Sequence, residues 1–143
     1  MAPYTVRPFS PAAVLLVAVA AAGCGGRYEV TGRVLYEDGS PVPAGTVLAE
    51  ATVDGKLVAL QGNIEPDGSF TLGGLKPGDG ALPGKYRAAV MPVALGDSER
   101  AAGKTPAVDG KFGQFETSGL SFEVKPEKNV ITLRVAKPKP RGG

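Results

Sequence analysis

Apolar and polar residues alternate with a period of two in short runs along most of this chain. In the first run Tyr28, Val30, Val34 and Tyr36 share one face, because successive side chains of a strand point to opposite faces. The 21 glycines and 13 prolines among 143 residues separate these runs. Short strands between turn residues are typical of β-sandwiches. The pattern predicts an all-β fold, a single sandwich of about seven strands over residues 28–136, without an amphipathic helix.

A two-residue turn fixes how two of the runs pair. Asp54 and Gly55 stand between strand-like segments, and both residue types tolerate the positive φ of a type I′ hairpin loop. With these two residues as the loop, Ala49 meets Leu60 across the hairpin. One face of the resulting pair is apolar and the other is mixed, as a half-buried sheet requires.

A second hairpin is predicted at Pro66, Asp67 and Gly68. Pro66 presets the φ of a type I turn, and Gly68 can take the left-handed position of a three-residue loop. Ile64 then faces Phe70, and both lie on the side that the first hairpin assigns to the core. The two turns therefore agree on one core.

The start of the chain has the parts of a secretory signal peptide over residues 1–23. It carries a single charge, Arg7, ahead of an uncharged run over residues 11–23. That run is too short to cross a bilayer as a helix, which needs about 20 apolar residues. The letters AAGC that end at Cys24 resemble the lipobox of bacterial lipoproteins, although alanine stands where leucine is usual. The resemblance implies that Cys24 is acylated and becomes the new N-terminus.

Cys24 is the only cysteine, and lipidation gives it a role. The alternative is a leftover thiol, which in an exported protein would stay unpaired and open to oxidation. Two or more acyl chains anchor a protein stably, since each buried methylene contributes about 0.8 kcal/mol. We therefore expect residues 24–27 to form a lipidated tether and membrane lipid to be a partner. The expected location is the bacterial cell envelope, facing the periplasm or the exterior.

The charge and composition of the chain bear on which classes of partner it can bind. The 16 basic and 14 acidic side chains give a net charge of +2, whereas nucleic-acid binding needs a concentrated positive face. We expect no nucleic-acid partner. The tail over residues 137–143 is basic and rich in proline, which favours an extended, solvated segment; an anionic contact is the alternative.

The sequence offers few groups for chemistry. Histidine is absent, so the usual catalytic dyads and zinc sites lack members. Aspartates that precede glycine are typical of turns, and five do so here: Asp38, Asp54, Asp67, Asp79 and Asp109. A calcium site among the loops is an alternative, but the spacing of an EF-hand is missing. We expect no enzyme, no cofactor and no metal.

Several turns together resemble one family. The segments TGRVLYEDGSPVP, EPDGSFTL and LPGKYRAAV resemble the carboxypeptidase regulatory-like domain, a transthyretin-like and Ig-like β-sandwich with D-G-x-P, D-G-x-F and P-G-x-Y motifs. The chain is also similar to small envelope lipoproteins of planctomycete-type bacteria. The matched positions include Gly39, Gly68, Gly84 and Tyr86, which are turn or core residues. The resemblance implies the fold and carries over no ligand residue. An insert before Tyr86 and the stretch after Met91 depart from it.

The stretch over residues 92–118 is long for a loop. At 27 residues it exceeds the usual limit of about 12–15 for structureless loops, which indicates a functional or poorly ordered segment. Phe112 and Phe115 lie here beside Lys111 and Gln114. The two phenylalanines could cap one end of the sandwich, or the four residues could form a contact site for a partner.

Two functions remain open. The first is a non-catalytic, lipid-anchored module of the cell envelope that contacts protein or glycan near the membrane surface. The alternative is an accessory or recruitment subunit of an envelope transport or secretion complex, in which the sandwich recruits an enzyme or pump. In both, only residues 25–27 separate Cys24 from the first strand. Three extended residues span roughly 10 Å, so the domain would stay close to the bilayer.

Overall fold

A computed structural model describes residues 26–74, 76 and 78–139. The predicted signal peptide, Cys24 and the last four residues of the tail lie outside these residues. The described chain forms seven strands, which confirms the expected count: β1 (Val30–Tyr36), β2 (Thr46–Val53), β3 (Lys56–Asn63), β4 (Ser69–Leu72), β5 (Gly84–Met91), β6 (Leu120–Val124) and β7 (Asn129–Val135).

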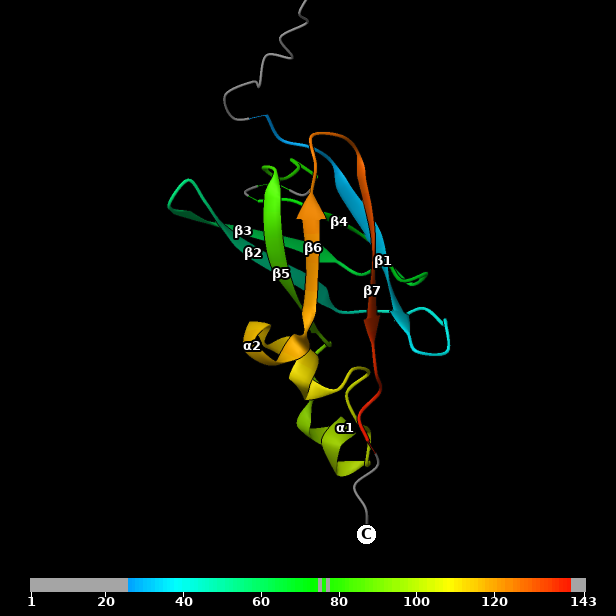
Figure 1. Ribbon diagram of the computed structural model, residues 1–143. Helices are drawn as coiled ribbons and strands as arrows, with labels where there is room; N and C mark the ends of the chain where they lie inside the picture. The colour runs from blue at the N-terminus through cyan, green and yellow to red at the C-terminus, as the bar shows by residue number, and fades with distance from the viewer. Residues whose placement is uncertain (1–25, 75, 77, 140–143) are drawn as a thin grey trace, which may run out of the picture.

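The strands form the two sheets of a sandwich (Figure 1). One sheet has the order β4-β1-β7 and the other the order β3-β2-β5-β6. β1 and β7 are parallel over seven residue pairs, and the other neighbouring strands are antiparallel. The chain passes from one sheet to the other four times: between β1 and β2, between β3 and β4, between β4 and β5, and between β6 and β7. The predicted all-β sandwich is therefore confirmed.

The core lies between the sheets, on the faces that the alternating pattern predicts. Tyr86, in β5, is buried and stacks on the Phe122 ring of β6, with 5.4 Å between the ring centroids. Burial raises the pKa of the Tyr86 hydroxyl, which donates a hydrogen bond to the carbonyl of Leu82 at 2.7 Å. Fully buried side chains line both sheets: Val30, Val34, Val47, Leu72, Val90, Val124 and Val135.

The β2–β3 hairpin has the predicted register. Ala49 pairs with Leu60, and the turn is closed by Asp54 and Gly55. Asp54 has a φ of 51° and Gly55 a φ of 75°, the left-handed conformations that a type I′ loop requires. Among the described residues, Asp54 is the one non-glycine residue that has a positive φ. This shows how strongly the turn is constrained.

Gly55→Ala should lower the stability of the domain, because an alanine in the left-handed region costs about 1–2 kcal/mol. Nothing lies within 4 Å of a β-carbon at this position, so backbone strain alone causes the loss. The matched control is Gly110→Ala, where the space is also open but φ is not in the left-handed region. In thermal unfolding, the first variant should lose several degrees and the control almost none. Equal midpoints would contradict the type I′ turn.

The second predicted hairpin forms at its tip, and its strands then separate. The Gly68 N–H donates to the Glu65 carbonyl and the Glu65 N–H to the Ser69 carbonyl, both at 2.8 Å. Ile64 and Phe70 are buried, as predicted. However, β3 and β4 enter different sheets, and beyond the tip a backbone bridge between residues 61 and 73 joins the two segments just past the end of β4.

Two Asp-Gly turns are closed by the aspartate side chain. Asp67 accepts hydrogen bonds from the Ser69 N–H at 2.9 Å and the Ser69 hydroxyl at 2.5 Å. Asp38 does the same with Ser40, at 3.0 and 2.6 Å. The side-chain hydrogen bond from the serine lowers the pKa of each aspartate. These carboxylates therefore serve the turns, which is the role predicted for them; Gly39 and Gly68 supply the positive φ.

Candidate functional site

The segment over residues 92–118 lies at one end of the sandwich, which we call the distal end. The described chain begins at the opposite end, and β7 runs toward the distal end (Figure 1). Three short helical elements form here: α1 (Asp97–Ala101), the 3-10 helix η1 (Gly110–Gly113) and α2 (Phe115–Ser118). The sequence predicted none of them, because helices of four or five residues are too short for a recognisable hydrophobic period.

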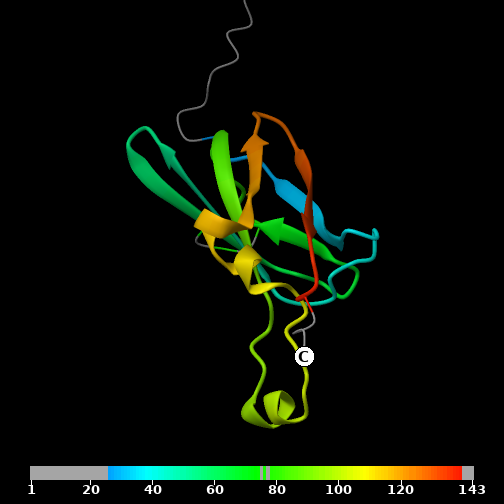
Figure 2. The same cartoon turned by 60° about the horizontal axis from the view of Figure 1, so that its bottom comes forward.

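The first half of the segment, residues 92–106, projects from the sandwich as a finger. Two extended legs carry α1 at its tip (Figure 2), and no residue of the finger is buried. The polar contacts of Glu99 stay within the finger. The Gly96 N–H donates to Glu99 Oε2 at 3.0 Å, and Lys104 Nζ lies 3.4 Å from Glu99 Oε1. The finger is therefore folded without support from the core.

The second half of the segment closes the distal end of the core. Phe112 and Val108 are buried in the core cluster. The Tyr36 hydroxyl donates to the Ala107 carbonyl at 2.8 Å, and the Asp109 N–H donates to the Ala136 carbonyl at 2.9 Å. The capping interpretation is confirmed for Phe112, whose ring packs inward.

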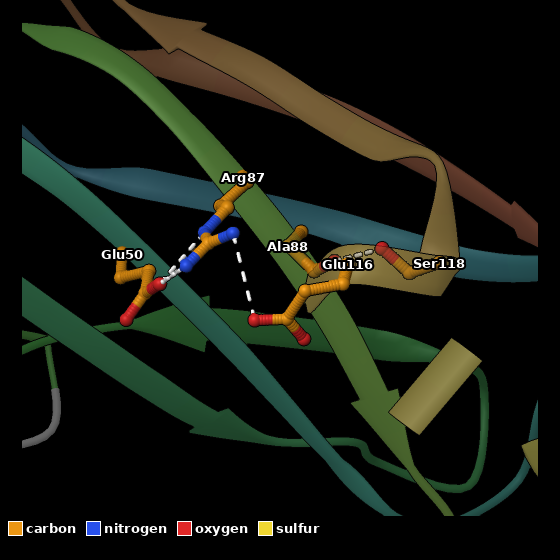
Figure 3. A network of polar contacts seen from close by, with 5 residues as sticks. All are labelled: Glu50, Arg87, Ala88, Glu116 and Ser118. Atoms are coloured by element: carbon orange, nitrogen blue, oxygen red, sulfur yellow. Dashed lines mark hydrogen bonds and ion pairs between the residues drawn. The ribbon is translucent and has the colours of Figure 1, made fainter. Parts of the chain in front are cut away.

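α2 packs on the outer face of the four-stranded sheet. Buried Ser118 donates from its hydroxyl to the Ala88 carbonyl at 2.5 Å. Arg87 Nε donates to Glu50 Oε1 at 2.7 Å, and Arg87 Nη1 lies 3.8 Å from Glu116 Oε1 (Figure 3). The same guanidinium lies 5.1 Å from the centroid of the Phe115 ring, a distance typical of cation–π contacts. Phe115 is thus held against the sheet with one side open.

The predicted contact residues other than Phe112 reach the surface. Lys111 and Gln114 are exposed and Phe115 is half-buried. Lys111 Nζ lies 5.0 Å from the centroid of the Phe112 ring, so its ammonium group covers the capping ring. The residues that the sequence suggested for a partner therefore divide into one core residue and three surface residues.

Two exposed apolar residues extend this surface, and the sequence reasoning missed both. Met91 and Val93 end β5 and begin the finger, with 46% and 61% of their surface exposed. A β-carbon on Gly113 would lie 3.9 Å from the Val90 carbonyl oxygen, which places η1 beside the same end of β5. We call the finger together with Met91, Lys111, Gln114 and Phe115 the distal surface. The signal available in the sequence was Val93, an apolar residue next to proline outside a strand pattern.

A hollow of about 580 Å³ is lined by residues of β1, β4 and β7 and by β3 of the other sheet. It contains none of the predicted contact residues. Its lining is rich in hydroxyl, amide and cationic side chains: Thr31, Arg33, Gln61, Thr71, Lys76 and Thr132.

No group of three or more histidine, cysteine, aspartate or glutamate side chains in the described part of the chain could hold a metal ion. Among residues 26–74, 76 and 78–139, no helix combines the length and the apolar character needed to cross a membrane.

The chain matches no protein-family model, and no curated protein matches it. The resemblance to the carboxypeptidase regulatory-like domain, which depends on turn and core positions, stays a prediction.

Proposed function

We propose that this protein is a non-catalytic, lipid-anchored β-sandwich module of the bacterial cell envelope that presents its distal surface to a partner protein. The observation that carries the proposal is the finger. It is folded, it projects from the end opposite to the start of the described chain (Figures 1 and 2), and it buries none of its residues. Ordering a residue costs about 1–2 kcal/mol of backbone entropy, so a finger that adds nothing to the core has another use.

The composition of the distal surface favours a protein over a glycan. Met91 and Val93 expose apolar area beside charged groups, and Phe115 is fixed by its contact with Arg87. Apolar, aromatic and arginine side chains in one patch are typical of the centres of protein interfaces. The chain also lacks histidine, which leaves the common catalytic dyads without a member and supports a binding role.

Because the proposed tether is short, it determines which end of the domain lies next to the membrane. With lipid on Cys24, the three residues 25–27 give about 10 Å of extended chain between the membrane and Tyr28, which pairs with Ala81 just before β1 begins. The distal surface then faces away from the bilayer. It can meet envelope proteins that rise above the membrane surface or lie opposite to it.

A photo-reactive residue at Ser98 should capture one defined protein in living cells. Ser98 is an exposed residue of α1, so the probe replaces no core contact. The matched control places the same residue at Val130, which is 81% exposed but lies in β7, near the other end of its sheet. We expect a discrete adduct from position 98 and none of the same mass from position 130.

The identity of the captured protein separates the two functions. A component of a transport or secretion machine would support the accessory-subunit alternative. Adducts of equal pattern and yield from both positions would contradict the proposed role of the distal surface, because a specific partner contacts one face.

A further inference from the structure

The tip of the β2–β3 hairpin extends beyond the neighbouring strand β5. β2 pairs with β5 only from Thr46 to Glu50, whereas β2 and β3 stay paired up to the turn. Residues 54–57, which we call the arm, therefore project beyond β5 on the half of the sandwich where β1 begins (Figure 1). Closer to the sheet, Ala51 is buried and Val53 and Val58 pack against the core. Near its tip Leu57 exposes 68% of its surface, although leucine is among the residues most often buried.

The arm lies next to the start of the described chain. Arg27 Nη1 lies 3.9 Å from Asp79 Oδ2. A β-carbon on Gly74 would contact both Arg27 Nη1, at 3.2 Å, and the Ala59 carbonyl oxygen, at 3.8 Å. Ala59 is two residues from Leu57, which is roughly 7 Å along a strand. The guanidinium of Arg27, the last residue of the proposed tether, is thus close to the base of the arm.

Two lysines lie close to Leu57, one of them next to it in the chain with its side chain on the opposite face of β3. Lys56 precedes it in the arm, and Lys85 lines one shallow hollow together with Leu57. Both lysines are exposed, and no ion pair among the described residues engages either of them. Asp54 lies in the same turn, so the electrostatic attraction to anions is small. An exposed leucine flanked by free ammonium groups fits the boundary between phosphate head groups and acyl chains.

We propose that the arm is a membrane contact in which Leu57 enters the acyl region of an anionic phospholipid bilayer while Lys56 and Lys85 face its phosphates. The inference rests on the proposed lipid anchor, because the tether brings this end of the domain to the membrane. The anchor supplies the affinity, and the arm fixes the orientation. The two contacts together hold the sandwich with its distal surface directed away from the lipid.

The absence of tryptophan from the chain gives a direct test. Leu57→Trp places a single fluorophore at the arm tip, where the large exposure of the native side chain leaves room for it. Val93→Trp is the matched control, an exposed apolar residue at the distal end. Each full-length chain is purified from membranes and reconstituted on vesicles of phosphatidylcholine and phosphatidylglycerol.

We expect the Leu57→Trp protein to show a blue-shifted emission and to lose roughly half or more of its fluorescence to phospholipids brominated in the acyl chain, as burial of the indole requires. The Val93→Trp protein should keep the emission of a solvated indole. If both chains bind the vesicles and neither is quenched, the arm contact is wrong while the anchor stands. Equal quenching of both contradicts the orientation. Failure of both chains to bind vesicles contradicts the anchor itself.

Discussion

Replacing Gly32 with alanine should strongly destabilise the domain. Gly32 lies in β1 between Phe70 of β4 and Ile131 of β7. A β-carbon there would lie 2.2 Å from the Ile131 carbonyl oxygen and 2.8 Å from Cζ of Phe70. The first of these atoms belongs to the backbone of a paired strand, so it cannot rotate away.

The size of the effect follows from the packing. Overpacking a core costs about 1–3 kcal/mol, and more where the backbone must move. A domain is stable by only about 5–15 kcal/mol, and this sheet has just three strands. We expect a loss of about 3 kcal/mol or more, seen as a large fall in the midpoint of thermal or urea unfolding. Gly110→Ala is the control, because nothing lies within 4 Å of a β-carbon at that position. A wild-type midpoint for Gly32→Ala would mean that β1 and β7 are not packed as described.

The features that could be predicted from the sequence are local ones. Asp54 and Gly55 fix the pairing of β2 with β3, since a two-residue loop allows one register. The period of two then assigns the inward faces of every strand, and these assignments agree with the buried residues. The turn role of Asp67 followed from its position before Gly68. Each of these signals acts over a few neighbouring residues.

The division of strands between the sheets has no such local signal. The turn at residues 65–69 predicts a hairpin, and the hairpin does form at its tip. β4 then leaves β3 and joins β1, and β1 pairs in parallel with β7 from the far end of the chain. Parallel pairing over such a separation depends on packing between elements that no short stretch of sequence contains.

The distal surface was only partly predictable for a similar reason. Phe112 and Phe115 are close in sequence and equally apolar, yet one packs into the core and the other lies on the outer face of the sheet. The turn from η1 to α2 at Gln114 causes the difference. The helix α1 of the finger buries no residue and has no apolar face. The periodic apolar pattern by which most helices are recognised in a sequence is therefore absent.

Cys24→Ser should abolish acylation and release the protein from the membrane. Labelling with a fatty-acid analogue in cells is expected to fall to background, since serine offers no thiol for the first acyl chain. The uncharged run over residues 11–23 is shorter than the about 20 residues that a spanning helix needs. It therefore gives no stable replacement for the lost lipid.

The arm also has too little apolar surface to hold the protein at the membrane without the lipid anchor. A variant of the arm therefore serves as the control for Cys24→Ser. Even one myristoyl chain binds a bilayer only marginally and reversibly, and a single leucine offers far less apolar surface. Leu57→Asp should therefore stay in the membrane fraction, with full labelling at Cys24, whereas Cys24→Ser appears in the soluble fraction with an unchanged unfolding midpoint. Undiminished labelling of the Cys24→Ser chain would place the acyl group elsewhere. Release of Leu57→Asp together with full labelling would mean that the arm, and not the lipid, holds this domain at the membrane.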